Sequence, residues 1–413
     1  MKGGIVISSK KNILIVLSII IILATCLNVS GLNDKKDKIK LTQEEMMEDY
    51  MHIWKTLEEN SLILLELKNN NVDLLNIFLD YKEQIQNCNN EKDFFLILNS
   101  FLNSFNEFGH LALLDYWMYN YFIEVYSSHE EMKPWLDVLT NNKVKENYQI
   151  WKNIIGKNNW LEDNTENISN NVTTKILEKD RIAYINIKSF RDEFVDINYD
   201  KLYSFYKQIQ EYPHLIIDIT NNGGGSDKYW IKNIVYPNLK QTLSFTNFSL
   251  IKLTDSNKDF ISVFLNDKNM LLPIKDLEMI DIEKNVLSES NYFFKNTVTL
   301  EKKSEPIFKG RIWVMIGERV YSSSDLFAKF CKDTGFATLV GETTKGNGAG
   351  EIDPIIFSLP NSKLIVRYDM TYSLNSDGTN NQTYGTTPDI VFSSAENPLN
   401  DCLKVINQYE LNN

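Results

Sequence analysis

A short run of serines stands where a nucleophile could sit. Residues 320–325 read Val-Tyr-Ser-Ser-Ser-Asp, between an apolar run typical of a buried strand and a segment typical of a helix. A serine at the start of a helix lies beside unpaired backbone N–H groups and the positive end of the helix dipole. Those groups can stabilise a developing oxyanion. Helix capping explains the same residues without any chemistry, because Ser and Asp are favoured N-cap residues.

A glycine-rich turn follows a second apolar run. Residues 218–225 read Asp-Ile-Thr-Asn-Asn-Gly-Gly-Gly. Glycines let the backbone approach a ligand closely and aim its N–H groups outward, although a plain turn explains the run equally well. The GxGxxG and GxxxxGK spacings are absent, so this is not a dinucleotide or phosphate loop. Ligands of open α/β sheets gather at the carboxyl ends of strands, where both polar segments are expected.

A serine nucleophile needs a base, and the chain has four histidines. His110 follows a Phe-Gly pair at the end of a helical stretch and precedes the apolar residues 111–114. The other three lie in a charged helix, in a polar Ser-Ser-His-Glu-Glu segment and just before a strand; they are His52, His129 and His214. A lone histidine is more often structural than catalytic, so residue types alone do not assign the base.

The elements that must position these residues change in kind along the chain. Apolar residues recur at helical spacing from residue 42 to about 158, which predicts an α-helical N-terminal domain over 32–158. Residues 159–175 are rich in Asn, Asp, Glu and Thr, and we expect a linker there.

Strands and helices then alternate, which predicts an α/β domain over 176–413. Residues 238–304 show weaker order and are interpreted as a variable insertion. A β-hairpin is expected over 355–372, with its turn near residues 360–362. The expected core strands are 181–187, 215–219, 312–316 and 337–340, and the expected helices are 202–212, 226–235 and 326–332.

Composition narrows the function classes. A chain of 413 residues suggests two or three domains, and 43% hydrophobic residues can fill a sizeable core. The net charge of −12 argues against nucleic acid as a partner. The four cysteines are far apart and include no CxxC pair, which excludes a disulfide-stapled scaffold and disfavours a structural zinc site.

The N-terminus predicts export. Three lysines precede an apolar run over residues 13–27, and a polar stretch follows it, as in a secretory leader over residues 1–31. Leu-Ala-Thr-Cys, ending at Cys26, is similar to a lipoprotein box apart from its threonine, so Cys26 is a candidate lipidation site. Lipid anchor, uncleaved signal anchor and full secretion stay open, and each places the bulk of the chain outside the cytoplasm.

Together, the two polar segments resemble motifs of the C-terminal processing (tail-specific) serine peptidase family. The resemblance covers about residues 176–393 and the neighbourhood of His110. It implies a crotonase/ClpP-like α/β core, here preceded by an α-helical N-terminal domain. The matching segments are 218–225 with the family's DLRxNxGG element, 322–325 with its SASE-type motif, 333–344 with DxGxAxxVGExT and 385–389 with GxxPD.

The resemblance also implies roles. Ser322 matches the nucleophile, and the backbone N–H of Ser323, with that of Gly224 or Gly223, would form the oxyanion hole. One branch of the family uses a lysine 25 residues after the serine as its base, and Asn347 stands there.

The other branch, which includes the tricorn core protease, uses a histidine in a short Gly-His context, which His110 matches. This branch also has an acid three residues before the glycine of GxxPD. Here that residue is Gln382, which can orient an imidazole but cannot stabilise its charge, and Asp377 is a nearby substitute.

The main hypothesis is therefore an extracytoplasmic serine peptidase that hydrolyses peptide bonds and requires no cofactor or metal. Its expected partners are a peptide or protein substrate and the membrane, through the N-terminal anchor or lipid; the oligomeric state stays open. The departures at Gln382 and Asn347 motivate an alternative, a weak or inactive pseudoenzyme that binds peptides or lipids on the same fold. Acyl-CoA chemistry, suggested by the crotonase-like core, is disfavoured by export.

Overall fold

The computed structural model describes residues 39–156, 170–265, 269–278, 282–348, 350, 352–392 and 397–412. The predicted leader with Cys26, and residues 159–169 of the predicted linker, lie outside these ranges. Residues Leu41–Asn413 form one unit. None of the helices described in it combines the length and the apolar character that crossing a membrane requires.

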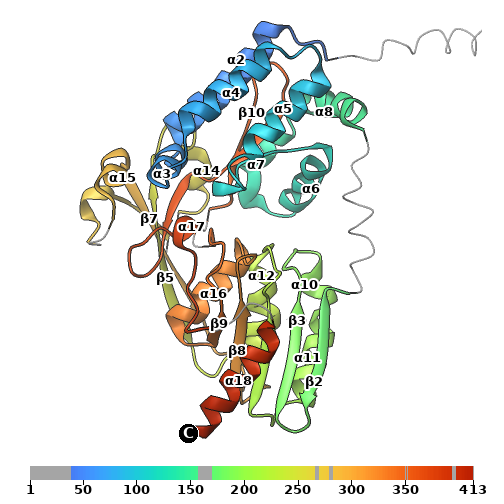
Figure 1. The fold of residues 1–413 in the computed structure, drawn as a ribbon, viewed down its shortest axis with the longest axis vertical. Coiled ribbons are helices and arrows are strands. Elements are labelled where there is room, and N and C mark those ends of the chain that lie inside the picture. Colours follow the sequence, from blue (N-terminus) through green and yellow to red (C-terminus); the bar gives the residue numbers. More distant parts are fainter. Residues whose placement is uncertain are drawn as a thin grey trace, which may run out of the picture. The chain divides into compact units, whose positions relative to one another are not determined.

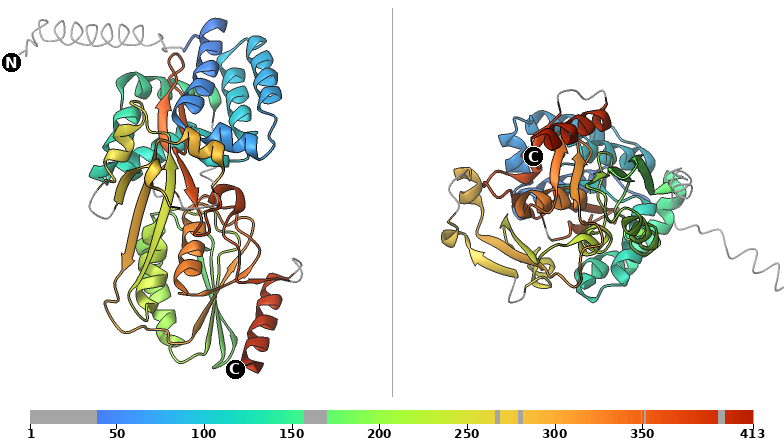
Figure 2. Two further views of the ribbon diagram at one scale, coloured as in Figure 1. Left: turned by 90° about the vertical axis from the view of Figure 1, so that its left-hand side faces the viewer. Right: turned by 90° about the horizontal axis from the view of Figure 1, so that it is seen from below.

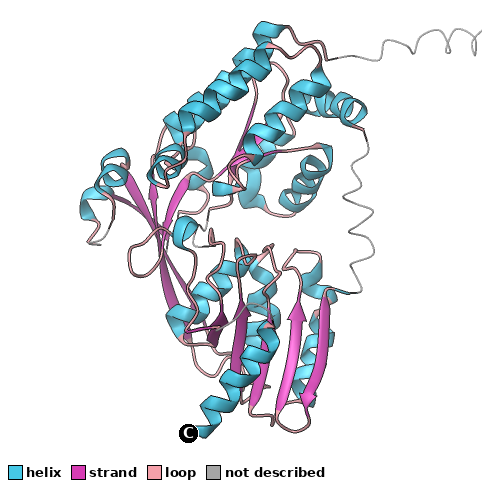
Figure 3. Cartoon of the chain, viewed as in Figure 1, coloured by secondary structure: helices cyan, strands magenta, loops and turns pink. Residues whose placement is uncertain are grey.

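The N-terminal part of this unit is helical (Figure 3). Helix α2 (Gln43–Asn60) begins at a capping box, in which the side chains of Thr42 and Glu45 each accept a hydrogen bond from the other's backbone N–H. The further elements are α3 (Ile63–Asn69), α4 (Leu74–Gln86), α5 (Glu91–Asn103), η1 (Phe108–His110), β1 (Ala112–Leu113), α6 (Tyr116–Ser127), η2 (Glu130–Met132), α7 (Lys133–Leu139) and α8 (Asn142–Ile155).

The C-terminal part is built on a six-stranded sheet of order β13-β9-β8-β4-β3-β2. Only the β2–β3 pair is antiparallel; the other neighbours run parallel, as expected where helices connect successive strands. The fold class is α/β, as the sequence predicts. The strands are β2 (Val172–Glu178), β3 (Ile182–Ile187), β4 (His214–Asp218), β8 (Arg311–Ile316), β9 (Thr338–Gly341) and β13 (Ile390–Val391).

Helices cover both faces of this sheet, as Figures 1 and 2 show. Side chains such as Ile217 and Val314 alternate onto one face, where they pack against α11, α12 and α16. Ile216 and Trp313 point to the other face, against α18. The helices are α10 (Phe194–Ile197), α11 (Tyr199–Gln208), α12 (Asp227–Trp230), η4 (Ile231–Val235), α13 (Tyr236–Asn238), α16 (Ser323–Thr334), α17 (Asn381–Tyr384) and α18 (Pro398–Leu411).

The region interpreted as a weakly ordered insertion, 238–304, contains three strands of an antiparallel sheet of order β12-β5-β7-β6. Its long strands carry polar cross-strand pairs, such as Thr246 with Thr297, which hide the apolar signal of a strand. The elements are β5 (Leu243–Ile251), α14 (Lys258–Ser262), β6 (Asn269–Pro273), η5 (Ile274–Asp276), α15 (Lys284–Glu289), β7 (Tyr292–Leu300) and β12 (Thr371–Leu374).

The predicted hairpin forms from β10 (Ile355–Ser358) and β11 (Ile365–Tyr368), and β11 also pairs with β1 of the helical part. It packs among the helices: Trp135 Nε1 donates to Pro354 O at 2.9 Å and Trp151 Nε1 donates to Ser362 O at 3.0 Å. The Asp49 carboxylate accepts from Ser362 N at 2.8 Å. The helical part and the α/β part therefore share this hairpin, which fixes one against the other.

Candidate active site

The two polar segments predicted at strand ends meet, because β4 and β8 are neighbouring parallel strands. Asp218 ends β4 ahead of the glycine turn, and Ile316 ends β8 a few residues before Ser322. A Cβ at Gly224 would lie 2.6 Å from Tyr321 O and 3.0 Å from Ser322 Cβ, and its φ is +101°. Only glycine permits this close approach of the two segments.

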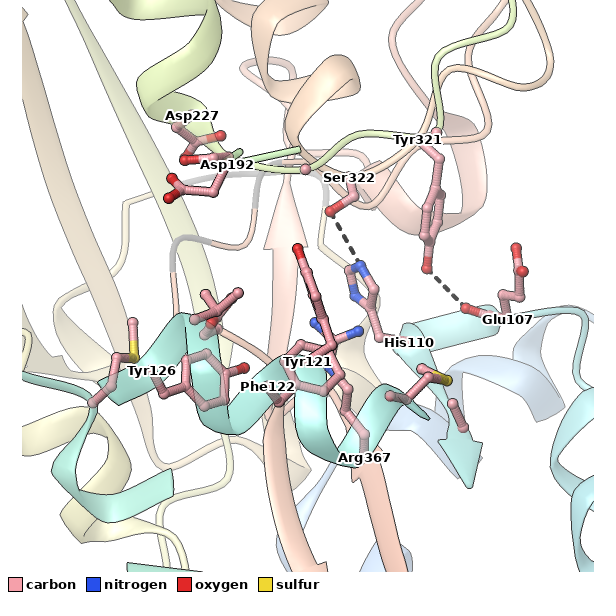
Figure 4. Close-up of a pocket in the computed structure, with 18 of the residues that line it drawn as sticks. Glu107, His110, Tyr121, Phe122, Tyr126, Asp192, Asp227, Tyr321, Ser322 and Arg367 are labelled. Carbon is pink, nitrogen blue, oxygen red and sulfur yellow. Dashed lines mark hydrogen bonds between the residues drawn. The ribbon is translucent and has the colours of Figure 1, made fainter. Parts of the chain in front are cut away.

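Ser322 precedes α16, but its side chain does not cap the helix. Its backbone is strained, with φ 57° and ψ −130°, a region that residues with a Cβ rarely adopt. Its Oγ lies 3.2 Å from His110 Nε2, as Figure 4 shows. The hydroxyl of Ser324 instead links the two segments. It accepts a hydrogen bond from Tyr321 N at 3.0 Å and donates one to Asn222 O at 2.6 Å. Capping therefore does not explain Ser322.

His110 reaches this serine from a turn that follows α5. Asn106, Glu107 and His110 have positive φ, as does Gly109, so the turn is tight and left-handed. A Cβ at Gly109 would lie 2.6 Å from Ile63 Cδ1. A bulkier residue there would shift the turn and move the imidazole.

The carboxylate on the imidazole belongs to Asp369. Ala112 of β1 pairs with Arg367 of β11, and continuing this antiparallel register by two residues brings His110 opposite Asp369. His110 Nδ1 lies 3.0 Å from both carboxylate oxygens, and the two side chains are only 12% and 8% exposed. A bond at Nδ1 leaves Nε2 free to accept the proton of Ser322.

Gln382, expected to orient the ring, lies elsewhere. Its Oε1 accepts from the backbone N–H of Gly109 at 3.2 Å, so it contacts the turn before His110 rather than the imidazole. Asp377, the substitute, accepts from Thr379 within its own loop, and this hydrogen bond lowers the pKa of its carboxyl. Counting back from the GxxPD motif did not find the carboxylate that contacts His110, because strand pairing sets which residue lies opposite this histidine.

Asn347, at the position where the other branch carries lysine, joins the same cluster. Its Nδ2 lies 2.7 Å from Asp369 Oδ2, 2.9 Å from Tyr321 Oη and 2.6 Å from His110 Nδ1. Asn347 Nδ2 and His110 Nδ1 both lie within hydrogen-bond distance of the Asp369 carboxylate. Lys345 forms an ion pair with Glu107 at 2.6 Å.

Of the expected oxyanion donors, two amides remain available. The Gly224 N–H donates to Asn222 Oδ1 at 2.9 Å and is thereby occupied. Within the described residues, the amides of Gly223, which lines the cavity, and Ser323, the first residue of α16, have no protein acceptor. Gly223 is thus the better placed of the two glycines.

Two buried carboxyls support the walls of the site. Asp227 accepts from Ser323 Oγ at 2.6 Å, and Asp325 accepts from Thr344 Oγ1 at 2.5 Å and from Gly348 N at 3.0 Å. Burial raises the pKa of both carboxyls. Asp325 thereby holds the segment 344–348 that carries Asn347.

The other histidines have structural surroundings. His214 is buried, and its Nε2 lies 2.9 Å from Glu410 Oε1 on α18. His52 packs edge-on against Phe357, and His129 contacts Lys228 at the rim of the cavity. None of the three contacts Ser322 in the described structure.

Ser322 and His110 line a cavity of about 940 Å³ (Figure 4). Helix α6 supplies an aromatic wall with Tyr121, Phe122 and Tyr126. Among the described residues, no cluster of His, Cys, Asp or Glu could hold a metal ion.

Comparisons with known proteins show which family and which solved structures this chain resembles. The model of peptidase family S41 matches residues 181–392. No curated protein matches the chain. A putative peptidase from Parabacteroides merdae has a similar structure, with a TM-score of 0.52 and 18% identity over 89% of this chain and 97% of its own. Mature CPAF complexed with lactacystin has a TM-score of 0.55 and 11% identity over 90% of this chain and 99% of its own. At these identities the solved structures establish likeness of fold alone.

Sequence reasoning missed Asp369, Tyr321 and Asn222. Asp369 lay inside the predicted hairpin, but nothing in the sequence shows that β11 pairs with residues 112–113. Its only signal is a carboxylate just after an apolar strand.

Proposed function

This chain belongs to peptidase family S41 and is a serine-type peptidase, and on that premise we propose that Ser322, His110 and Asp369 form its catalytic triad. The observation that carries the proposal is the continuous chain of contacts, 3.2 Å from Ser322 Oγ to His110 Nε2 and 3.0 Å from Nδ1 to the Asp369 carboxylate. These distances fall within the reach expected of a nucleophile and its base.

In the proposed acylation step, Ser322 Oγ attacks the carbonyl carbon of a peptide bond while His110 Nε2 takes the hydroxyl proton. The Asp369 carboxylate accepts from Nδ1–H and stabilises the imidazolium that forms. The amides of Ser323 and Gly223 donate to the oxyanion. His110 then returns the proton to the leaving amine as the C–N bond breaks.

In deacylation a water molecule gives a proton to His110 and attacks the acyl carbon. The carboxylic acid product leaves as Ser322 regains its proton. Asn347 and Tyr321 lie beside the triad, and Asn347 Nδ2 donates to Asp369 Oδ2. This bond holds the carboxylate in place beside the imidazole.

Hydrolysis of denatured casein tests the assignment. Wild-type protein is expected to release peptides, and Ser322→Ala and His110→Ala are expected to reduce the rate by about 10³-fold or more. His52→Ala is the matched control, because that imidazole lies outside the cavity, and it should retain the wild-type rate. Undiminished hydrolysis by Ser322→Ala would reject the nucleophile.

The binding-only alternative loses its motivation in this geometry. It rested on the lack of a carboxylate at residue 382 and of a lysine at residue 347. Asp369 offers a carboxylate to the imidazole, and Asn347 hydrogen bonds to it. Both departures are thus compatible with turnover.

We further propose that the peptidase acts outside the cytoplasm. The support is the basic start, the apolar run over residues 13–27 and the polar stretch that follows. Expression in a bacterial host, followed by digestion of intact cells or spheroplasts with added protease, tests the location. Incorporation of labelled palmitate that Cys26→Ser abolishes would establish the lipid anchor, whereas digestion only after lysis would contradict export.

A further inference from the structure

Arg367 brings a cation into the catalytic cavity. It stands on β11, two residues before Asp369, and its side chain lines the cavity that holds Ser322 and His110. Figure 4 shows Arg367 on the same side of the cavity as Tyr121 and Phe122 of α6. A ligand that enters this cavity therefore meets a positive group as well as the serine.

The donors of this guanidinium have no protein partner in the described chain. Its Cζ lies 4.8 Å from the centroid of the Phe122 ring, which supports the flat face of the group. The side chain forms no ion pair and donates no hydrogen bond to the described residues, and Nε is buried without an acceptor. Leaving the buried Nε–H of a charged group unsatisfied is costly, so the arrangement favours a ligand that supplies acceptors.

Arg311 shows the contrast. It too lies over aromatic rings, with Cζ 4.9 Å from the centroid of Trp313 and 4.4 Å from that of Tyr409. Its guanidinium, however, donates to Thr338 Oγ1 at 2.8 Å and to Tyr409 Oη at 2.9 Å. It begins β8, at the opposite end of the strand from the segment that leads to Ser322. Stacking of an arginine in this fold therefore does not by itself leave the donors unused.

The charged residues that line the cavity indicate where a negative group of a ligand would lie. Asp192 and Asp227 lie across the cavity from Arg367, on the side of Ser322. Asp353 also lines the cavity but forms no ion pair with Arg367. A negative group is attracted to the Arg367 end, and the planar guanidinium matches the two oxygens of a carboxylate.

We propose that Arg367 binds a carboxylate of the peptide substrate and so selects which bond is presented to Ser322. This proposal rests on the proposed peptidase function and adds a substrate class to it, peptides with a carboxylate near the scissile bond. Two sources share this chemistry, the C-terminal α-carboxylate and the side chain of Asp or Glu. The test separates them.

Three synthetic peptide pools serve as probes. The first lacks Asp and Glu and has free C-termini; the second has the same sequences as C-terminal amides; the third is amidated and contains one Asp or Glu at varied positions. Cleavage rates by mass spectrometry are compared for wild type, Arg367→Gln, Arg367→Lys and the control Arg311→Gln.

Wild type is expected to cleave the first or the third pool about 10- to 100-fold faster than the second. Arg367→Gln should abolish that preference, so that the first and third pools are cleaved no faster than the second. Arg367→Lys keeps the charge without the planar fork and should retain part of the preference. Arg311→Gln should behave as wild type. The faster pool identifies the source of the carboxylate.

A binding measurement separates failure of this proposal from failure of the peptidase function. Ser322→Ala and Ser322→Ala/Arg367→Gln are each incubated with the pools, and the retained peptides are identified. Selective retention of carboxylate peptides by the single variant alone supports the proposal even without turnover. Equal retention of all pools, or the same preference in both variants, overturns it.

Discussion

The substitution Asp369→Asn probes the residue that the sequence did not reveal. In the native site His110 Nδ1 lies 3.0 Å from both oxygens of a carboxylate that is only 8% exposed. An asparagine of the same shape can place its NH₂ against Nδ1, which favours the tautomer with the proton on Nε2. That ring cannot accept the proton of Ser322.

The expected loss can be stated in advance. In Ser-His-Asp enzymes the same change lowers kcat by about 10⁴-fold. At about 1.36 kcal/mol per decade, this corresponds to about 5.4 kcal/mol of lost transition-state stabilisation. Because Asp369 is nearly buried, little water can replace the lost charge, so the full effect is expected here.

The assay is the initial rate of casein hydrolysis at saturating substrate, with the thermal unfolding midpoint as a check on folding. Asp377→Asn is the matched control, since that carboxylate bonds within its own loop, and it should stay within about twofold of wild type. If Asp369→Asn keeps more than a tenth of the activity while Asp377→Asn or Gln382→Ala loses most of it, the assignment of the acid is refuted.

Two further changes test the support of the site. Gly224→Ala places a Cβ 2.6 Å from Tyr321 O at a φ of +101°, so we expect about 1–3 kcal/mol of destabilisation and a loss of activity of about 10²-fold from the displaced oxyanion hole; a fully active variant of wild-type stability would contradict this. Burial, and secondarily the Asp369 charge, raises the pKa of Glu66 well above its ordinary value. The stability tied to protonated Glu66 is full below the unfolded pKa of about 4.3 and is lost as pH rises through the folded pKa. The unfolding temperature of Glu66→Gln should therefore rise progressively above that of wild type as the pH increases from about 4.5. If the unfolding midpoints of the two proteins instead change in parallel with pH, Glu66 is not a buried acid with a raised pKa.

Much of the fold could be predicted from local patterns in the sequence. Short apolar runs ending in Asp218 and Ile316 are buried strands, and the polar residues after them meet because parallel strands end at one edge. Ser322 and His110 could be singled out as candidate nucleophile and base because each stands in a local motif. These features need only a few consecutive residues.

The features that sequence reasoning missed depend on pairing across long separations. Asp369 faces His110 only because β11 pairs with β1, more than 250 residues away along the chain. The sheet within 238–304 was hidden because polar residues stand on both of its faces: Thr246 pairs with Thr297 on one face, and Asn247 and Ser249 are buried on the other. Whether Gly223 or Gly224 has a backbone N–H available for an oxyanion depends on which of the two amides donates to the Asn222 side chain. None of these relations leaves a pattern within one short segment.

The most direct test of the central claim is to map the adduct of a fluorophosphonate probe by peptide mass spectrometry. We predict a single adduct on Ser322 in the wild-type protein, and labelling slowed by at least about 10²-fold in His110→Ala. An adduct on another serine, or labelling of Ser322 at an unchanged rate without the imidazole, would contradict it.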